Sequence, residues 1–227
     1  MKYNNIYEGT FLSRPNRFIA NVLIDGKETV CHVKNTGRCR ELLIPGAKVL
    51  LEKSSNPSRK TQYDLVKVYK GERLINMDSS APNTVFGEFL ESGRLGFIPE
   101  LIKPEYTYGD SRFDYYFERD GKKAFVEVKG VTLEDNNIAR FPDAPTERGI
   151  KHLRGLMKCV KQGFEAYAVF IIQMRGIESF KPAWDKHREF ALTLREAEKA
   201  GVKILAFDCD VTEDGLYIAD KVNIDLS

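Results

Sequence analysis

The feature that most constrains the fold is a change of pattern near Asn83. The first 80 residues contain strand-like runs separated by turn-rich segments, whereas helix-like and strand-like segments alternate afterwards. Short strands with Gly/Pro turns indicate a small barrel or a curled sheet, and alternation indicates a mixed α/β domain. We therefore expect an α+β chain of two domains, residues 1–80 and 81–227.

The first part contains a strong hairpin signal. Asp25-Gly26 lies between strand-like runs at residues 18–24 and 27–33, and two-residue turns of this type join antiparallel strands. Further runs occur at 48–52 and 62–69. Residues 1–80 also hold 14 Lys and Arg against 8 Asp and Glu, a net charge of +6, whereas the remainder holds 21 against 25, a net charge of −4. This basic part is suited to a polyanion, and a solvated surface without a partner is the alternative.

The second part is expected to alternate helices with strands. Helices are predicted at residues 83–91, 146–161 and 184–200, and strands at 112–118, 123–129, 166–174 and 202–207. Asn83, which follows Pro82, is the expected N-cap of the first of these helices. The apolar face of that helix is predicted to consist of Val85, Phe86, Phe89 and Leu90.

Composition excludes several classes of protein. With 42% hydrophobic and 30% charged residues the chain is expected to fold, and its longest apolar stretch, 168–172, is too short to span a bilayer. The first residues, MKYNNIYEG, lack the apolar region of a signal peptide, so a cytoplasmic location is expected. None of the four cysteines forms a C-x-x-C pair, and the three histidines are scattered. Carboxylates must therefore supply most of the ligands of any metal site.

A second hairpin signal, Asp120-Gly121, brings candidate catalytic residues together. A two-residue loop there would place Asp114 directly opposite Glu127 on paired strands. Lys129 would share their face, because side chains alternate along a strand. These three residues form the predicted site.

Two ionised carboxylates about 5 Å apart repel by about 3 kcal/mol at an effective dielectric constant of 20. Mg²⁺, or Mn²⁺, would relieve this repulsion, because such ions prefer oxygen ligands and retain bound waters. Lys129 would orient the attacking water or offset phosphate charge, which suits phosphodiester chemistry. The alternative is a surface hairpin on which lysine and arginine simply neutralise the acids.

Two helices are expected to contribute further residues. Glu88, at the border of the first helix's apolar face, is a candidate fourth ligand, and a solvated carboxylate is the alternative. In the helix that Thr146 is expected to cap, Arg148, Lys151 and His152 lie away from the apolar stripe. They could meet phosphate near the helix N-terminus, or could form a solvated basic face.

Five segments resemble the sugar fermentation stimulation protein family, in the same order along the chain. They are HVKNTGRCRELLIPG, NPSRKTQYDL, GDSRFDYYF, FVEVKGVTL and FPDAPTERGIKHLRGL. The resemblance implies an N-terminal OB-like domain and a C-terminal domain of the PD-(D/E)XK nuclease type. It also implies DNA binding and a role in regulating sugar metabolism.

The resemblance also implies roles for individual residues. Asp114, Glu127 and Lys129 match the D…E-x-K pattern of that nuclease fold, and Glu88 matches the helix glutamate. Further polar positions that match the family are Glu105, Asp143 and His152. The basic and aromatic residues expected to contact nucleic acid in the OB-like part are Arg14, Arg17, Phe18, Asn35, Arg38, Arg59 and Lys60.

Two functions remain open from the sequence. One is a magnesium-dependent nuclease, and the other is a DNA-binding regulator that keeps a nuclease scaffold without turnover. A carbohydrate-acting enzyme is a poor third interpretation, because no aromatic platform for a sugar accompanies the hairpin. Neither the form of the nucleic acid nor the oligomeric state follows from the sequence.

Overall fold

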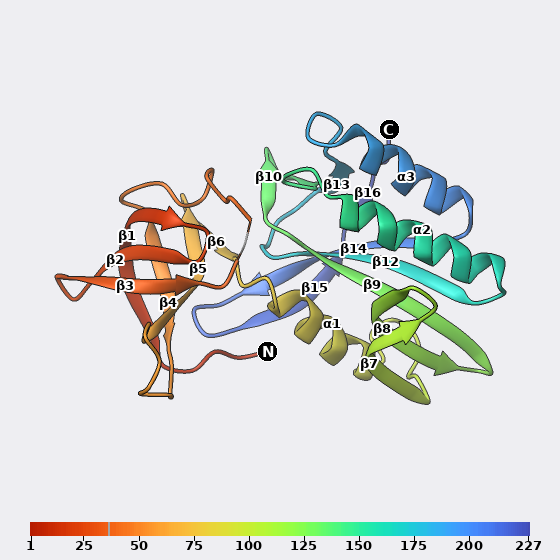
Figure 1. The fold of residues 1–227 in the computed structure, drawn as a ribbon, viewed down its shortest axis with the longest axis horizontal. Helices are drawn as coiled ribbons and strands as arrows, with labels where there is room; N and C mark the ends of the chain where they lie inside the picture. The colour runs from red at the N-terminus through yellow and green to blue at the C-terminus, as the bar shows by residue number, and fades with distance from the viewer. Residues whose placement is uncertain (36) are drawn as a thin grey trace.

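The computed structural model describes residues 1–35 and 37–227, which form two adjacent domains (Figure 1). The N-terminal elements are β1 (Ile6–Asn16), β2 (Ile19–Ile24), β3 (Lys27–Val33), β4 (Lys48–Lys53), β5 (Tyr63–Lys70) and β6 (Arg73–Asn76). Sheet order β3-β2-β1-β4-β5-β6, with an extra pairing of β3 to β5, closes them into a barrel. The expected small barrel is therefore confirmed, including the turn at Asp25-Gly26, where both residues have positive φ.

The second domain is built on a six-stranded mixed sheet in the order β15-β14-β12-β9-β8-β7. Its strands are β7 (Leu101–Tyr108), β8 (Ser111–Arg119), β9 (Lys122–Val131), β12 (Glu165–Ile172), β14 (Lys203–Val211) and β15 (Leu216–Lys221). The central strands β9, β12 and β14 are parallel, and the outer neighbours pair in antiparallel fashion. The mixed α/β domain expected from the sequence is confirmed.

Helices cover both faces of this sheet. The helix α1 (Ala81–Glu91) packs with Val126 and Val128 on one face, and α2 (Glu147–Lys161) packs with Phe125 and Val131 on the other. Beside α2 lies α3 (Arg188–Lys199) (Figure 1). Because consecutive β9 side chains alternate between faces, the odd-numbered positions of this strand point towards α2.

A small sheet in the order β10-β11-β13-β16 completes the second domain. Its strands are β10 (Leu133–Asp135), β11 (Ile138–Phe141), β13 (Ser179–Pro182) and β16 (Asn223–Ile224). No helix in the described part of the chain is long and apolar enough to cross a membrane.

Buried polar contacts join the two domains. Gln173 follows β12, and its amide nitrogen donates to Asn76 Oδ1 (2.8 Å) and to the carbonyl of Asp78 (3.0 Å). The Tyr3 hydroxyl accepts from the amide of Asn76 and donates to the carboxylate of Asp78. The N-terminal segment also reaches the second domain, since the backbone of Lys2 forms an isolated antiparallel β-bridge with Gly215. Such satisfied buried groups fix the orientation of the barrel on the sheet.

Some predicted boundaries are wrong. The first helix begins at Ala81 with Ser80 as N-cap, so Asn83 lies inside it and its side chain is free for another partner. The third helix begins at Arg188, because residues 184–186 form a turn before the N-cap His187. Thr146 is the N-cap of α2 as predicted, since its side chain accepts from the amide of Gly149.

Candidate metal and nucleic-acid site

The site forms where β8 and β9 separate. The predicted hairpin register is confirmed from Arg119–Lys122 to Tyr115–Val126, but the pairing of the two strands stops before Asp114. The carboxylate of Asp114 instead accepts the backbone N–H of Val128 at 2.7 Å. Because the pairing of β8 with β9 ends at Tyr115, the side chain of Asp114 reaches the backbone of Val128, next to Glu127. The predicted direct opposition of Asp114 and Glu127 is wrong.

The side chain of Asn83 supplies the second support of Asp114. Its amide nitrogen donates to Asp114 Oδ1 at 2.9 Å, which brings the first turn of α1 to the site. Burial, and then the negative charge of Glu127, raise the pKa of Asp114 above its usual range. The ionised form of this carboxyl group is therefore disfavoured in the folded protein.

Glu127 lies at the centre of the site, and only 2% of its surface is exposed. Its Oε1 atom contacts both Lys129 Nζ and His152 Nδ1. Burial would raise the pKa of Glu127, but the contacts with His152 and Lys129 outweigh burial and lower it. The carboxylate is therefore held in its ionised form.

The other oxygen of this carboxylate, Glu127 Oε2, is buried and has no hydrogen-bond partner among the described residues. An orphaned, buried carboxylate oxygen is costly and calls for a ligand. Asp114 lies beside it and is itself destabilised by the negative charge of Glu127. A pair of carboxylates in this state fits a hard divalent cation, with Asp114 and Glu127 as its protein ligands.

Lys129 shares the face of Glu127, as predicted, and its side chain is 20% exposed. The next residue, Gly130, must be glycine: a Cβ atom there would lie 2.6 Å from Gln173 Oε1 and 2.7 Å from Pro82 Cγ. This close approach packs the start of α1 against β9 and keeps Asn83 within reach of Asp114.

His152 does not lie on the exposed basic face where the sequence placed it. It is 9% exposed, faces the sheet from α2 and contacts Glu127 and Lys129. The sequence carried a signal for this, since Gly149 and Leu156, three residues before and four after His152, are also buried.

Glu88 is not part of the cluster. Its carboxylate accepts from the N-terminal amino group of Met1 at 2.6 Å, and its side chain is 53% exposed. Glu105 is exposed and pairs with Arg112 at 3.3 Å on the outer strands. The structure therefore groups Asp114, Glu127 and Lys129 with His152 rather than with Glu88.

The outer face of α2 carries a basic groove. A cavity of about 480 Å³ is lined by Asp110, Ser111, Glu147, Arg148, Ile150, Lys151, Arg154, Gly155 and Lys158. Arg148 and Lys151 are exposed there, as predicted. Arg148 Nε lies 3.4 Å from His152 Nε2, so the groove adjoins the carboxylate site.

The predicted contact residues of the barrel fall into two groups. Arg14 donates to the carbonyls of Arg17, Asn35, Gly37 and Arg38, and Arg59 forms a bidentate pair with Asp64. These two side chains hold the barrel's loops in place, which the sequence did not reveal. By contrast Arg17, Phe18, Arg38 and Lys60 are exposed, and the Arg17 guanidinium lies 5.0 Å from the centre of the Phe18 ring.

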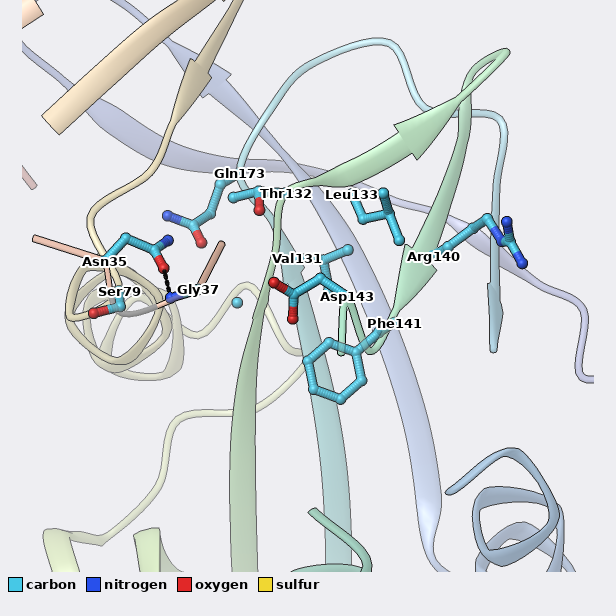
Figure 2. Close-up of a pocket in the computed structure, with 11 residues that line it drawn as sticks. Asn35, Gly37, Ser79, Val131, Thr132, Leu133, Arg140, Phe141, Asp143 and Gln173 are labelled. Carbon is cyan, nitrogen blue, oxygen red and sulfur yellow. Dashed lines mark hydrogen bonds between the residues drawn. The ribbon is translucent and has the colours of Figure 1, made fainter. Parts of the chain in front are cut away.

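A cavity of about 290 Å³ lies between the domains, at the carboxyl end of β9 (Figure 2). Asn35 and Ser79 line it from the side of the barrel, and Gly130, Phe141 and Asp143 line it from the other domain. Figure 2 shows the carboxylate of Asp143 pointing into this space. The side chain of Asn35 is already engaged, because it accepts from Gly37 N–H and donates to the carbonyl of Met77.

Another potential ligand group lies at the N-termini of α2 and α3. Ligand atoms of Glu147, His187 and Glu189 all lie within 4.8 Å of one another. The two glutamates are exposed, and His187 Nδ1 already accepts the N–H of Thr146. This group is separate from the carboxylates of the hairpin, and we assign it no role.

Both domains match family models. The model described as "Sugar fermentation stimulation protein RE domain" matches residues 80–215, and the "SfsA N-terminal OB domain" matches residues 12–77. These matches confirm the resemblance and the OB domain expected from the sequence.

Relatives match over nearly the whole chain. A "Sugar fermentation stimulation protein homolog" of Desulfitobacterium hafniense (strain DSM 10664 / DCB-2) is 60% identical over 100% of this chain and 99% of its own. The homolog of Clostridium beijerinckii is 56% identical over 99% of each chain. The solved structure of Pyrococcus furiosus SfsA in complex with Ca²⁺ has a TM-score of 0.89 and 28% identity, over 99% of this chain and 98% of that chain.

Proposed function

The chain belongs to the sugar fermentation stimulation protein family, and we propose that it binds nucleic acid and hydrolyses phosphodiester bonds at a divalent-metal site. The observation that carries this proposal is the buried, unpartnered Oε2 atom of Glu127, beside Asp114 and within the reach of Lys129. Binding nucleic acid alone does not require a buried and a half-buried carboxylate next to a lysine.

Asp114 and Glu127 would hold the metal, with waters completing its coordination. The related Pyrococcus furiosus protein was solved with Ca²⁺, a hard cation with the same preference for oxygen ligands, which supports a divalent site; we propose Mg²⁺ or Mn²⁺ as the working ion. The bound ion would supply Lewis-acid activation of a phosphoryl oxygen or of a water molecule.

The neighbouring side chains have separate tasks. Lys129 would offset the charge that develops on the phosphate, because its ammonium group is held beside Glu127 yet remains partly accessible. His152 would fix the orientation of Glu127 through Nδ1, and it connects the site to Arg148. Asn83 would keep Asp114 in place through its amide.

Nucleic acid would run along the outer face of α2. Arg148 and Lys151 line the groove there, and Arg154 and Lys158 extend the row of cations along the same helix. Exposed Arg17, Phe18, Arg38 and Lys60 on the barrel would add phosphate and stacking contacts.

A cleavage assay tests the proposal. Wild-type protein is incubated with single-stranded, nicked and duplex DNA, each with Mg²⁺, with Mn²⁺ and with EDTA. Metal-dependent cleavage is expected from the wild type and from Glu105→Gln, an exposed control, and at least about 100-fold less from Glu127→Gln. Binding without cleavage under every metal condition would refute the enzymatic part and favour a regulatory DNA-binding module.

A further inference from the structure

A third cavity, of about 550 Å³, lies on the face of the sheet that α1 covers. It is bordered by the end of α1, the loop that follows it, and the starts of β12 and β14. Glu127 and Lys129 point to the opposite face, towards α2. The cavity is therefore separate from the carboxylate site, and its volume is typical of small-molecule sites.

The walls of this cavity are aromatic. Phe89, Phe97, Tyr167 and Phe207 all line it. Cations stack on three of these rings: Arg94 lies 5.1 Å from the Phe89 centre, Arg119 lies 4.0 Å from Phe97, and Lys203 lies 4.8 Å from Tyr167. Apolar rings interleaved with cations suit a ligand that is both flat and anionic.

The positive charge at this cavity exceeds its negative charge. Glu165 is shared by Arg119 at 3.3 Å, Lys203 at 3.2 Å and Lys122 at 3.8 Å, so one carboxylate serves three cations. Lys221 lines the cavity and has no ion-pair partner among the described residues.

Two further groups define what the cavity can accept. The Nε atom of Arg119 is buried without a hydrogen-bond partner, which leaves an unsatisfied donor beside the cavity. The lining carboxylate, Asp220, is already bound by Arg175 at 2.5 Å, and Arg94 is held by the carbonyls of Ile218 and Ala219. Lys221 is therefore the cation best placed to meet an incoming anion, and Lys203, which lines the same cavity, can add a second contact by sharing its charge with Glu165 and its hydrogen bond to the Tyr167 hydroxyl (3.0 Å).

We infer that this cavity binds a mononucleotide, with its phosphate at Lys203 and Lys221 and its base against the half-buried side chains of Phe97 and Leu205. A nucleoside monophosphate combines the two properties that the walls select, a flat aromatic ring and a compact anion. The site is independent of the proposed phosphodiesterase activity, because none of its residues belongs to the carboxylate site or to the α2 groove.

Calorimetric titration of the full chain in metal-free buffer tests the inference. AMP is expected to bind at one site, and adenosine or inorganic phosphate alone at least about tenfold more weakly. Lys203→Gln and Lys221→Gln should each weaken AMP binding about tenfold, the usual effect of losing one charge-assisted hydrogen bond. Both lysines are exposed, but Lys203→Gln also removes the contacts of Lys203 with Glu165 and with the Tyr167 hydroxyl, so Lys221→Gln, which loses no ion pair among the described residues, is the cleaner test.

Two control variants locate the binding site. Lys103→Gln changes an exposed lysine on β7, and Lys151→Gln changes the α2 groove; both should bind AMP as the wild type does. AMP affinity that is unchanged in Lys203→Gln and Lys221→Gln, or that is lost in Lys151→Gln, would overturn the inference. Displacement of AMP from wild-type protein by a single-stranded oligonucleotide would also overturn it, because the cavity would then belong to the nucleic-acid surface.

Discussion

Replacing Asp114 by Asn should stabilise the metal-free protein and remove its response to metal. The negative charge of Glu127 disfavours the ionised form of Asp114, and two nearby carboxylates repel by about 3 kcal/mol at an effective dielectric constant of 20. The Asp114 carboxylate also accepts from Asn83 and Val128 and is attracted by Lys129, and these favourable interactions weaken in the variant. We therefore expect a net gain of about 1 kcal/mol, or about 2–4 °C in Tm.

The pH dependence of this gain follows from the raised pKa of Asp114. The ionised form of Asp114 is disfavoured in the folded protein and so lowers the free energy of unfolding. This destabilisation is absent below the pKa of Asp114 in the unfolded chain, about 3.9, and complete above its pKa in the folded protein. The stabilisation by Asn should accordingly be present at pH 7 and disappear as the pH falls below about 4.

Thermal unfolding in EDTA and in Mn²⁺ measures both effects. An ion at 100 times its Kd should stabilise the wild type by about 2.7 kcal/mol, which raises Tm by about 5–10 °C. Asp114→Asn should show little of this rise, whereas Asp110→Asn, which changes an exposed aspartate paired with Lys158, should keep it in full. A lower Tm than wild type in EDTA together with an undiminished response to Mn²⁺ would refute the reasoning.

Three further outcomes are expected. Arg148→Gln and Lys151→Gln should each weaken DNA binding and reduce the slope of log K against log salt by about 1, measured by fluorescence anisotropy; unchanged slopes would exclude the α2 groove. Arg59→Ala should destabilise the barrel by about 2 kcal/mol in urea unfolding, because it leaves Asp64 without its bidentate partner, whereas Lys60→Ala should change stability by less than about 0.5 kcal/mol; equal effects would contradict this role. Burial raises the pKa of Glu165, but Tyr167 and Lys203 outweigh burial and lower it to about 2, so Glu165→Gln should cost about 2 kcal/mol at pH 7 after allowance for solvent screening. That cost should be lost as the pH falls from about 4.3 towards 2, and a cost independent of pH would show that the ionised form is not what stabilises the fold.

The small barrel and the mixed sheet that follows it were predictable because local signals agreed with them. Both Asp-Gly turns form hairpins, and the apolar face of α1 is buried as its spacing predicted. By contrast the strands β1 and β7 were not predicted. Five of the eight β7 residues are exposed, and the β1 pairing contains register shifts, so neither strand shows a clean alternation.

The members of the candidate site were only partly predictable. Glu127 and Lys129 follow from alternation along β9, which is a local property. Asp114 reaches the site through a break in the ladder that a regular register cannot anticipate. His152 and Asn83 depend on how α2 and α1 pack on the sheet, and the position of Glu88 depends on the N-terminal segment. Such long-range contacts leave little trace in a local pattern.

The central claim is that Lys129 acts on a reacting phosphate beside a metal held by Asp114 and Glu127. The most direct test compares Lys129→Met with wild type, with DNA cleavage and DNA affinity measured on the same substrates in Mg²⁺ and in Mn²⁺. Cleavage should fall by about 100-fold or more, whereas affinity should fall only by the contribution of one phosphate contact. Equal losses of cleavage and affinity, or an undiminished cleavage rate, would contradict the account.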